Sequence, residues 1–238
     1  MTMQLSDEDR RRRIALLAIS AFAAVSLWQT YWGGILLYPF TILSTWFHEM
    51  GHGLAASLVG YRFQELLIYP DGSGVALSLV PEGSGSLAAA LVAAGGPLGP
   101  PLTGAALIIA SRTQRGTDIA LVALGTVLLL STAIWVRSLT GWLVLVPLAL
   151  ALLAIAWRDA PHRRQLVVQM LGVLACVSTY RQTGYLFSQG GVLGGLPQRS
   201  DTQAIADALF GTYWLWGAII TAGIALLLWR SFAIAFRK

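Results

Sequence analysis

The stretch that most constrains this chain reads Phe47-His48-Glu49-Met50-Gly51-His52-Gly53 and lies in a long apolar run, residues 35–59. Residues four apart share one face of a helix, so His48 and His52 can bind one zinc ion together. Glu49 can reach a zinc-bound water and act as its general base. A charged side chain at the centre of a bilayer costs about 2.5–3.5 kcal/mol, so such residues indicate an intramembrane function.

The composition is that of an integral membrane protein. Of the 238 residues, 56% are apolar and only 11% are charged, whereas a soluble domain carries about 25% charged residues. The single cysteine, Cys176, excludes a disulfide framework and a cysteine-ligated metal site within one chain. The net charge of +5 comes mostly from arginines at the ends of apolar runs, which indicates membrane topology and no nucleic-acid partner.

Seven apolar segments predict an all-α polytopic membrane protein that forms a single membrane-embedded domain over residues 1–238. They cover residues 14–32, 35–59, 86–110, 118–136, 139–157, 165–187 and 212–230. Most of them reach the ~20 residues that a bilayer-spanning helix needs. Residues 1–13 form a basic N-terminal segment. We expect a multi-pass protein in the lipid bilayer of a bacterial inner membrane, with an organelle membrane as the alternative.

Three stretches interrupt this pattern. A Pro-Asp-Gly-Ser-Gly turn between two β-prone runs predicts a β-hairpin at residues 61–80, directly after the motif helix. Residues 95–101 contain three prolines and three glycines, which predicts either a kinked helix packed tightly against a neighbour or a re-entrant element. Residues 188–211, glycine-rich and then polar, predict a loop before the last span.

Charge placement distinguishes the two possibilities for residues 86–110. With the four N-terminal arginines inside, seven crossings divide the 16 Lys and Arg residues evenly between the two sides. If residues 86–110 enter and return on one side, thirteen of the 16 lie inside and three outside. The positive-inside rule therefore favours six crossings, with both termini cytoplasmic.

The motif and its surroundings resemble the site-2 protease family of intramembrane zinc metallopeptidases, and most of all its small bacterial and plant branch. The resemblance lies in the motif itself, in Gly60 and the following Pro-Asp-Gly-Ser-Gly turn, and in Ala94-Gly95-Gly96-Pro97-Leu98-Gly99. It extends over residues 40–102 and, more weakly, over 188–215. It implies a zinc endopeptidase that cleaves transmembrane or membrane-proximal segments of membrane-protein substrates.

A catalytic zinc needs a third protein ligand. The resemblance implies an aspartate that follows a Leu-Pro element, and Leu196-Pro197-Gln198-Arg199-Ser200-Asp201 is similar to that arrangement. Asp201 is therefore the expected ligand, although a residue at this place can also cap the helix that follows. Asp207 is the alternative ligand. Asp71 can be argued as well, but turn chemistry alone explains it, and His162 is expected at the membrane interface.

Substrate contacts are expected from the hairpin and from the Gly-Pro element. An edge of the hairpin, on the strand that carries Leu77, offers a site where an extended substrate can add as a strand. Gly96 and Pro97 belong to a break in the helix that can supply water access or a lateral opening. Regulation is expected from a membrane partner or from the substrate itself.

The chain departs from the family pattern in two places. It contains no Asn, whereas the family usually carries one shortly after the Gly-Pro element, and Thr202 rather than Gly follows Asp201. These departures favour, as the alternative function, a proteolytically inactive relative that binds or chaperones membrane proteins with a retained zinc. A transporter lined by a broken helix is a third possibility.

Overall fold

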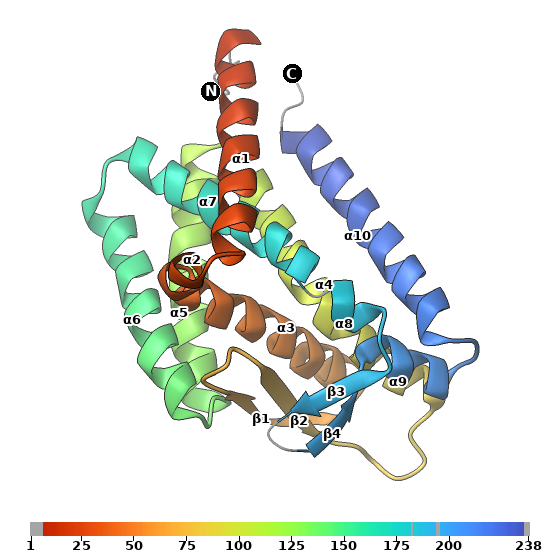
Figure 1. Ribbon diagram of the computed structural model, residues 1–238. Coiled ribbons are helices and arrows are strands. Elements are labelled where there is room, and N and C mark those ends of the chain that lie inside the picture. Colours follow the sequence, from red (N-terminus) through yellow and green to blue (C-terminus); the bar gives the residue numbers. More distant parts are fainter. Residues whose placement is uncertain (1–6, 182, 194–195, 236–238) are drawn as a thin grey trace.

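The computed structural model describes residues 7–181, 183–193 and 196–235, which are mostly helical with two small sheets at one end (Figure 1). The long helices are α1 (Asp7–Trp28), α3 (Tyr38–Leu58), α4 (Ser86–Ala110), α5 (Gln114–Ile134), α6 (Leu139–Arg158), α7 (Pro161–Arg181) and α10 (Tyr213–Ala235). The short helices are α2 (Tyr31–Leu36), α8 (Thr183–Leu186) and α9 (Asp201–Ala208).

Four of the described helices, α4, α5, α6 and α10, are long and apolar enough to cross a membrane. They correspond to the apolar segments predicted at 86–110, 118–136, 139–157 and 212–230. Large apolar side chains such as Leu143 and Leu226 remain exposed on α6 and α10, as expected where lipid is the solvent. The other predicted segments lie in α1 with α2, in α3, and in α7 with α8.

Helix α3 lies in the middle of the fold and carries the motif with His48 and His52 (Figure 1). Its apolar face packs into the main core, where Ile42, Trp46 and Met50 meet buried residues of α5 and α6. The indole nitrogen of Trp46 donates to Ser131 Oγ at 3.1 Å, so α3 is also tied to α5 by a buried polar bond. The motif therefore lies on a helix whose position is fixed by core packing and by this hydrogen bond.

The second helix against the motif, α4, approaches α3 backbone to backbone through glycines. A Cβ placed on Gly51 would lie 2.2 Å from the Gly95 carbonyl oxygen, and one on Gly99 would lie 2.2 Å from the Phe47 carbonyl oxygen. No side chain fits at either position. Small residues at helix interfaces in membranes allow the two backbones to approach each other in this way.

The re-entrant element predicted within residues 86–110 is wrong. Helix α4 continues through all three of its internal prolines, Pro97, Pro100 and Pro101. A proline leaves a backbone carbonyl without its usual donor, and a tightly packed neighbouring helix allows this to be tolerated at membrane depth. The structure thus adopts the other alternative, a proline-containing helix packed tightly against its neighbour.

Directly after α3, the strands β1 (Arg62–Ile68) and β2 (Gly74–Leu79) pair antiparallel. The other edge of β1 is already paired with the α5–α6 connection. Leu66 N–H donates to the Trp135 carbonyl, and Arg137 N–H donates to the Leu66 carbonyl. Strand β2 is therefore the open edge of this small sheet.

The segment predicted as a loop at 188–211 contains regular structure, so that prediction is wrong. Strands β3 (Gly190–Leu193) and β4 (Leu196–Arg199) pair antiparallel, and α9 follows at once. Glycine and proline weaken any strand pattern in a sequence. Here Gly190 has a φ of +133°, which few other residues adopt, and it allows the chain to enter the hairpin.

Candidate metal centre

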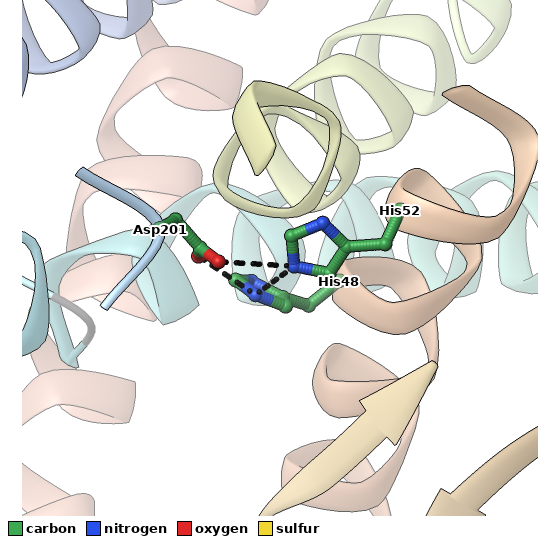
Figure 2. A group of neighbouring side chains, drawn as sticks. All are labelled: His48, His52 and Asp201. Carbon is green, nitrogen blue, oxygen red and sulfur yellow. Dashed lines mark hydrogen bonds and ion pairs between the residues drawn. The ribbon is translucent and has the colours of Figure 1, made fainter. Parts of the chain in front are cut away.

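Three side chains from two distant parts of the chain converge: His48 and His52 from α3, and Asp201 from the first turn of α9 (Figure 2). His48 Nε2 lies 3.2 Å from Asp201 Oδ2, and His52 Nε2 lies 3.2 Å from Asp201 Oδ1. The two Nε2 atoms are 3.1 Å apart. The predicted ligand set is therefore brought together in space.

These separations fit a zinc ion. Ligand atoms about 2.0–2.1 Å from a tetrahedral zinc lie roughly 3.3 Å from one another. His52 Nδ1 lies 2.8 Å from the Val92 carbonyl oxygen. A carbonyl only accepts, so Nδ1 carries the proton and Nε2 of the neutral ring presents a lone pair, as in a metal-binding histidine.

Asp201 is a buried carboxylate with one oxygen that a bound cation could contact. Its Oδ2 is buried and accepts no hydrogen bond, although it lies 3.2 Å from Nε2 of His48. A shared metal ion would satisfy the Asp201 oxygens and the imidazole lone pair at once.

Hydrogen bonds of the residues on either side of Asp201 hold the start of α9, so that the Asp201 side chain points toward α3. Ser200 is the N-cap, and its Oγ accepts from Gln203 N–H at 3.1 Å, so Asp201 is not needed as a cap. Ser200 Oγ also donates to the Ser188 carbonyl. Thr202 Oγ1 donates to the Leu186 carbonyl at 2.7 Å, and Ser200 and Thr202 are both fully buried.

Glu49 is buried beside the two histidines and faces strand β2. A Cβ placed on Gly74 would lie 2.8 Å from Glu49 Cγ, so the glycine leaves the space that this side chain occupies. The predicted general base is thus held between the metal ligands and the sheet.

Gly96 of α4 lies against the Nε2 atoms of His48 and His52. A Cβ there would lie 2.1 Å from His52 Nε2 and 2.7 Å from His48 Nε2. The sequence led us to expect a substrate contact at Gly96 and Pro97; the structure shows that Gly96 leaves room for the imidazoles, and that Pro97 is buried in the same helix.

The structure does not bring the other candidates to this cluster. Asp207 pairs with Arg199 and accepts from Gln203 Nε2 on the exposed side of α9. Asp71 accepts from the N–H and hydroxyl of Ser73, and these bonds lower the pKa of its carboxyl, so it serves the turn. His162 lies in the first turn of α7.

Several groups around the site were not identified from the sequence. The Ser200 and Thr202 hydroxyls occur in a polar stretch where many such residues are solvated. The Val92 carbonyl belongs to the backbone, so no residue type marks it. Gly74 and Gly96 belong to glycine-rich stretches that the sequence analysis singled out. Glycine indicates that another group approaches the backbone closely, but it does not show which group that is.

Comparison with known proteins agrees with this geometry. The model of the Peptidase M50B-like family matches residues 16–231. No curated protein and no solved structure matches the chain. Because the family match extends over most of the chain, the chain belongs to this family, which is the site-2 protease family.

Proposed function

We propose that this member of the site-2 protease family is a membrane-embedded zinc endopeptidase that hydrolyses transmembrane or membrane-proximal segments of other membrane proteins. The observation that carries the proposal is the convergence of His48, His52 and Asp201, with contacts of 3.1–3.2 Å, beside the carboxylate of Glu49. Three protein ligands with a neighbouring general base are what a catalytic zinc site requires.

When bound, Zn²⁺ supplies a Lewis acid that lowers the pKa of a water molecule toward ~7. His48, His52 and Asp201 would hold it. Glu49 follows His48 directly, so its carboxylate lies close enough to take the proton of the attacking water. It then returns that proton to the nitrogen of the leaving amine, which restores the carboxylate for the next cycle.

Strand β2 is the proposed docking edge for an unwound substrate, because a helical amide is shielded from attack. Leu66 directs its own N–H and C=O toward residues 135–137. Its partner Ala76 therefore belongs to a pair without hydrogen bonds, and its backbone groups face the open side. Leu77 pairs with Glu65, so the backbone N–H of Leu77 faces β1. The backbone N–H groups that face the open side of β2 are therefore those of Ala76 and Ser78, although the substrate contact was expected at Leu77.

We further propose six crossings of a bacterial inner membrane, with both chain ends cytoplasmic. Helices α1 and α3 together form one crossing, and the other five are α4, α5, α6, α7 and α10. Figure 1 shows the start of α1 and the end of α10 at the end opposite the sheets, with α1 and α3 following one another toward the sheets. The α4–α5 connection and the α6–α7 connection lie toward the end that carries the termini (Figure 1), and with the adjoining helix ends they contain Arg112, Arg115, Arg158, Arg163 and Arg164. The α5–α6 connection, β1 and β4 lie toward the opposite end and contain Arg137, Arg62 and Arg199. The positive-inside rule makes the more basic end cytoplasmic.

Cysteine accessibility in whole cells tests this orientation. In a Cys176→Ala background, a cysteine at Glu82 should react with a membrane-impermeant maleimide, and a cysteine at Arg115 should react only after the cells are opened. The reverse pattern would place the sheets in the cytoplasm.

The function itself is tested on detergent-purified protein by zinc content and by cleavage of model transmembrane substrates. Wild type should hold about one zinc per chain and cleave. Glu49→Gln should keep the zinc and lose activity by at least ~100-fold, since it removes general-base catalysis. If no zinc is bound under metal-replete conditions, the proposal fails. If wild type and Glu49→Gln bind zinc and are equally silent toward a panel of transmembrane segments, the inactive relative is the better description.

A further inference from the structure

We infer that an open pocket between the ends of α1 and α7 binds the phosphate group of an anionic phospholipid, and that Arg181 is the residue that contacts this phosphate. The pocket has a volume of about 480 Å³ and is lined by Trp28, Gln29, Tyr180, Arg181, Thr183 and Gly184. Sites for small ligands commonly measure about 300–1,000 Å³. None of these residues belongs to the proposed metal centre, so the pocket is a second site, and its assignment depends only on the proposed membrane orientation.

The guanidinium of Arg181 is held in place from within the protein. Its Nη1 donates to Thr41 Oγ1 at 3.0 Å, and its Cζ lies 5.2 Å from the centroid of the Trp28 ring. Thr41 Oγ1 also accepts from Trp28 Nε1 at 3.2 Å and donates to the Leu37 carbonyl at 3.3 Å. Both lone pairs and the proton of this hydroxyl are therefore used. Arg181 is thus positioned before a ligand arrives, which lowers the entropic cost of binding.

Arg181 has N–H groups to offer to a ligand. A guanidinium carries five N–H donors and no acceptor, and among the described residues the only hydrogen bond of Arg181 is the one to Thr41. No carboxylate in the part of the chain that the structure describes pairs with it. Because two parallel N–H groups of an arginine match two oxygens of a phosphate, an oxyanion is the ligand chemistry that this pocket fits.

The pocket lies in the half of the membrane nearer the sheets. Helix α7 starts at the end that carries the termini and slopes toward the sheets (Figure 1), and Arg181 is its last residue. With 21 residues, α7 is about 31 Å long, close to the ~30 Å of a hydrocarbon core. Even a tilted α7 therefore carries Arg181 past the centre of the bilayer, and the long side chain of an arginine can reach from there to the headgroups.

Exposed aromatic side chains accompany the pocket. Tyr180, which lines it, is 63% exposed, and Tyr31 and Trp32, which follow Gln29 closely in the chain, are each 77% exposed. Tyr and Trp gather at the boundary between membrane and water, since one part of each ring is apolar and the other polar. These residues support a pocket at the level where lipid phosphates lie.

The charges favour an anionic lipid over a zwitterionic one. None of the six lining residues is acidic, so an ammonium group of a lipid finds no carboxylate there. One face of the Trp28 ring, where a quaternary amine could bind, is already covered by Arg181. Phosphatidylglycerol avoids both problems, because it carries one uncompensated phosphate charge and hydroxyl groups that the side-chain amide of Gln29 can bind.

A lipid in this pocket is connected to the motif helix. Thr41, the hydrogen-bond partner of Arg181, lies on α3 two turns before Glu49. Positions 41, 45 and 49 share one face of that helix because they are spaced by four residues. The bound lipid would therefore link the ends of α1 and α7 to the start of α3.

The test is native mass spectrometry of the full chain, purified in an uncharged detergent and titrated with single lipids. Wild type should bind dioleoyl phosphatidylglycerol about fivefold more tightly than phosphatidylcholine with the same chains. Arg181→Gln should lower the affinity for phosphatidylglycerol about tenfold and remove this preference, since it removes hydrogen bonds to a charged group. Arg181→Lys keeps the charge without the paired N–H groups, so we expect an affinity between the two.

Arg137→Gln is the matched control. Arg137 also lies toward the sheets, but its guanidinium donates to the carbonyls of Ala133, Ile134 and Val136. This variant should bind both lipids as wild type does. Thermal melting checks that each variant is folded, and if Arg181→Gln does not fold, the comparison of Arg181→Lys with wild type decides.

Equal affinity for phosphatidylglycerol in wild type and the folded Arg181 variants would overturn the inference. An equal loss in Arg137→Gln would also overturn it, because it would indicate general attraction between a basic protein and an anionic lipid. Displacement of the lipid by millimolar glycerol phosphate would assign the pocket to a soluble phosphate compound. Displacement by a transmembrane peptide that carries a glutamate near its outer end would assign it to a protein substrate, and either result would overturn the lipid as occupant. None of these measurements uses zinc or cleavage, so they remain readable if the proposed function fails.

Discussion

The two halves of the proposed metal centre are held in different ways. The histidines stand one turn apart on α3, and glycine contacts between α3 and α4 fix that helix backbone to backbone. Asp201 comes from a short helix whose start is held by a few hydroxyl-to-carbonyl bonds. A ligand pair on a packed helix tolerates little added volume, whereas the aspartate depends on individual hydrogen bonds. Each half should therefore fail under a different kind of substitution.

The largest effect is expected where α4 contacts the histidine half. Gly96→Ala places a methyl group about 2 Å from His52 Nε2, and a helix backbone cannot withdraw from a neighbour packed at this distance. We expect purified Gly96→Ala to hold no stoichiometric zinc by elemental analysis. Gly223→Ala in α10 is the matched control, since a Cβ there meets nothing within 4 Å. Full zinc occupancy in Gly96→Ala would show that α3 and α4 are less rigid than this packing indicates.

A smaller effect is expected from the chemistry of the aspartate half. Asp201→Asn keeps the shape of the side chain but removes the charge that compensates the cation. We expect zinc affinity, measured by chelator competition, to fall by at least ~100-fold, since the loss of an outer partner of a ligand already costs about 10–100-fold. Asp207→Asn, on the same helix, removes only an exposed pair with Arg199 and should leave zinc affinity unchanged. An equal loss in both variants would mean that Asp201 acts through the stability of α9.

The same difference explains what could be predicted from the sequence. His48, Glu49 and His52 form a local pattern, so spacing alone indicates their chemistry. Asp201 was reached only through resemblance, because a carboxylate after a serine is also an ordinary cap. The β3–β4 hairpin was missed because glycine and proline mask a strand pattern. The re-entrant interpretation failed because the charge count treated residues 14–32 and 35–59 as two opposite crossings, whereas α1 and α3 follow one another toward the sheets (Figure 1).

The supports of Asp201 should matter less than Asp201 itself. Thr202→Val keeps the volume but leaves the Leu186 carbonyl without its buried donor, at a cost of about 1–3 kcal/mol. We expect zinc affinity to fall about tenfold, because residues that hold a metal ligand in place typically have an effect of this size when they are replaced. Thr183→Val is the control, because its hydroxyl bonds only within its own turn. Unchanged zinc affinity together with normal stability would show that Asp201 is placed without this bond.

The smallest effect is expected on the histidine half, at the contact between α3 and the hairpin turn. Thr45→Val removes the hydroxyl that donates to the Gly72 carbonyl but leaves the backbone packing of α3 and α4 intact. Zinc affinity should stay at the wild-type value, because neither histidine nor Asp201 depends on this bond. The turn should loosen, so amide exchange in residues 70–74 should rise by a fewfold, in keeping with the loss of one partly exposed hydrogen bond. A fall in zinc affinity here would contradict the comparison, since it would show that the histidine half also depends on individual hydrogen bonds.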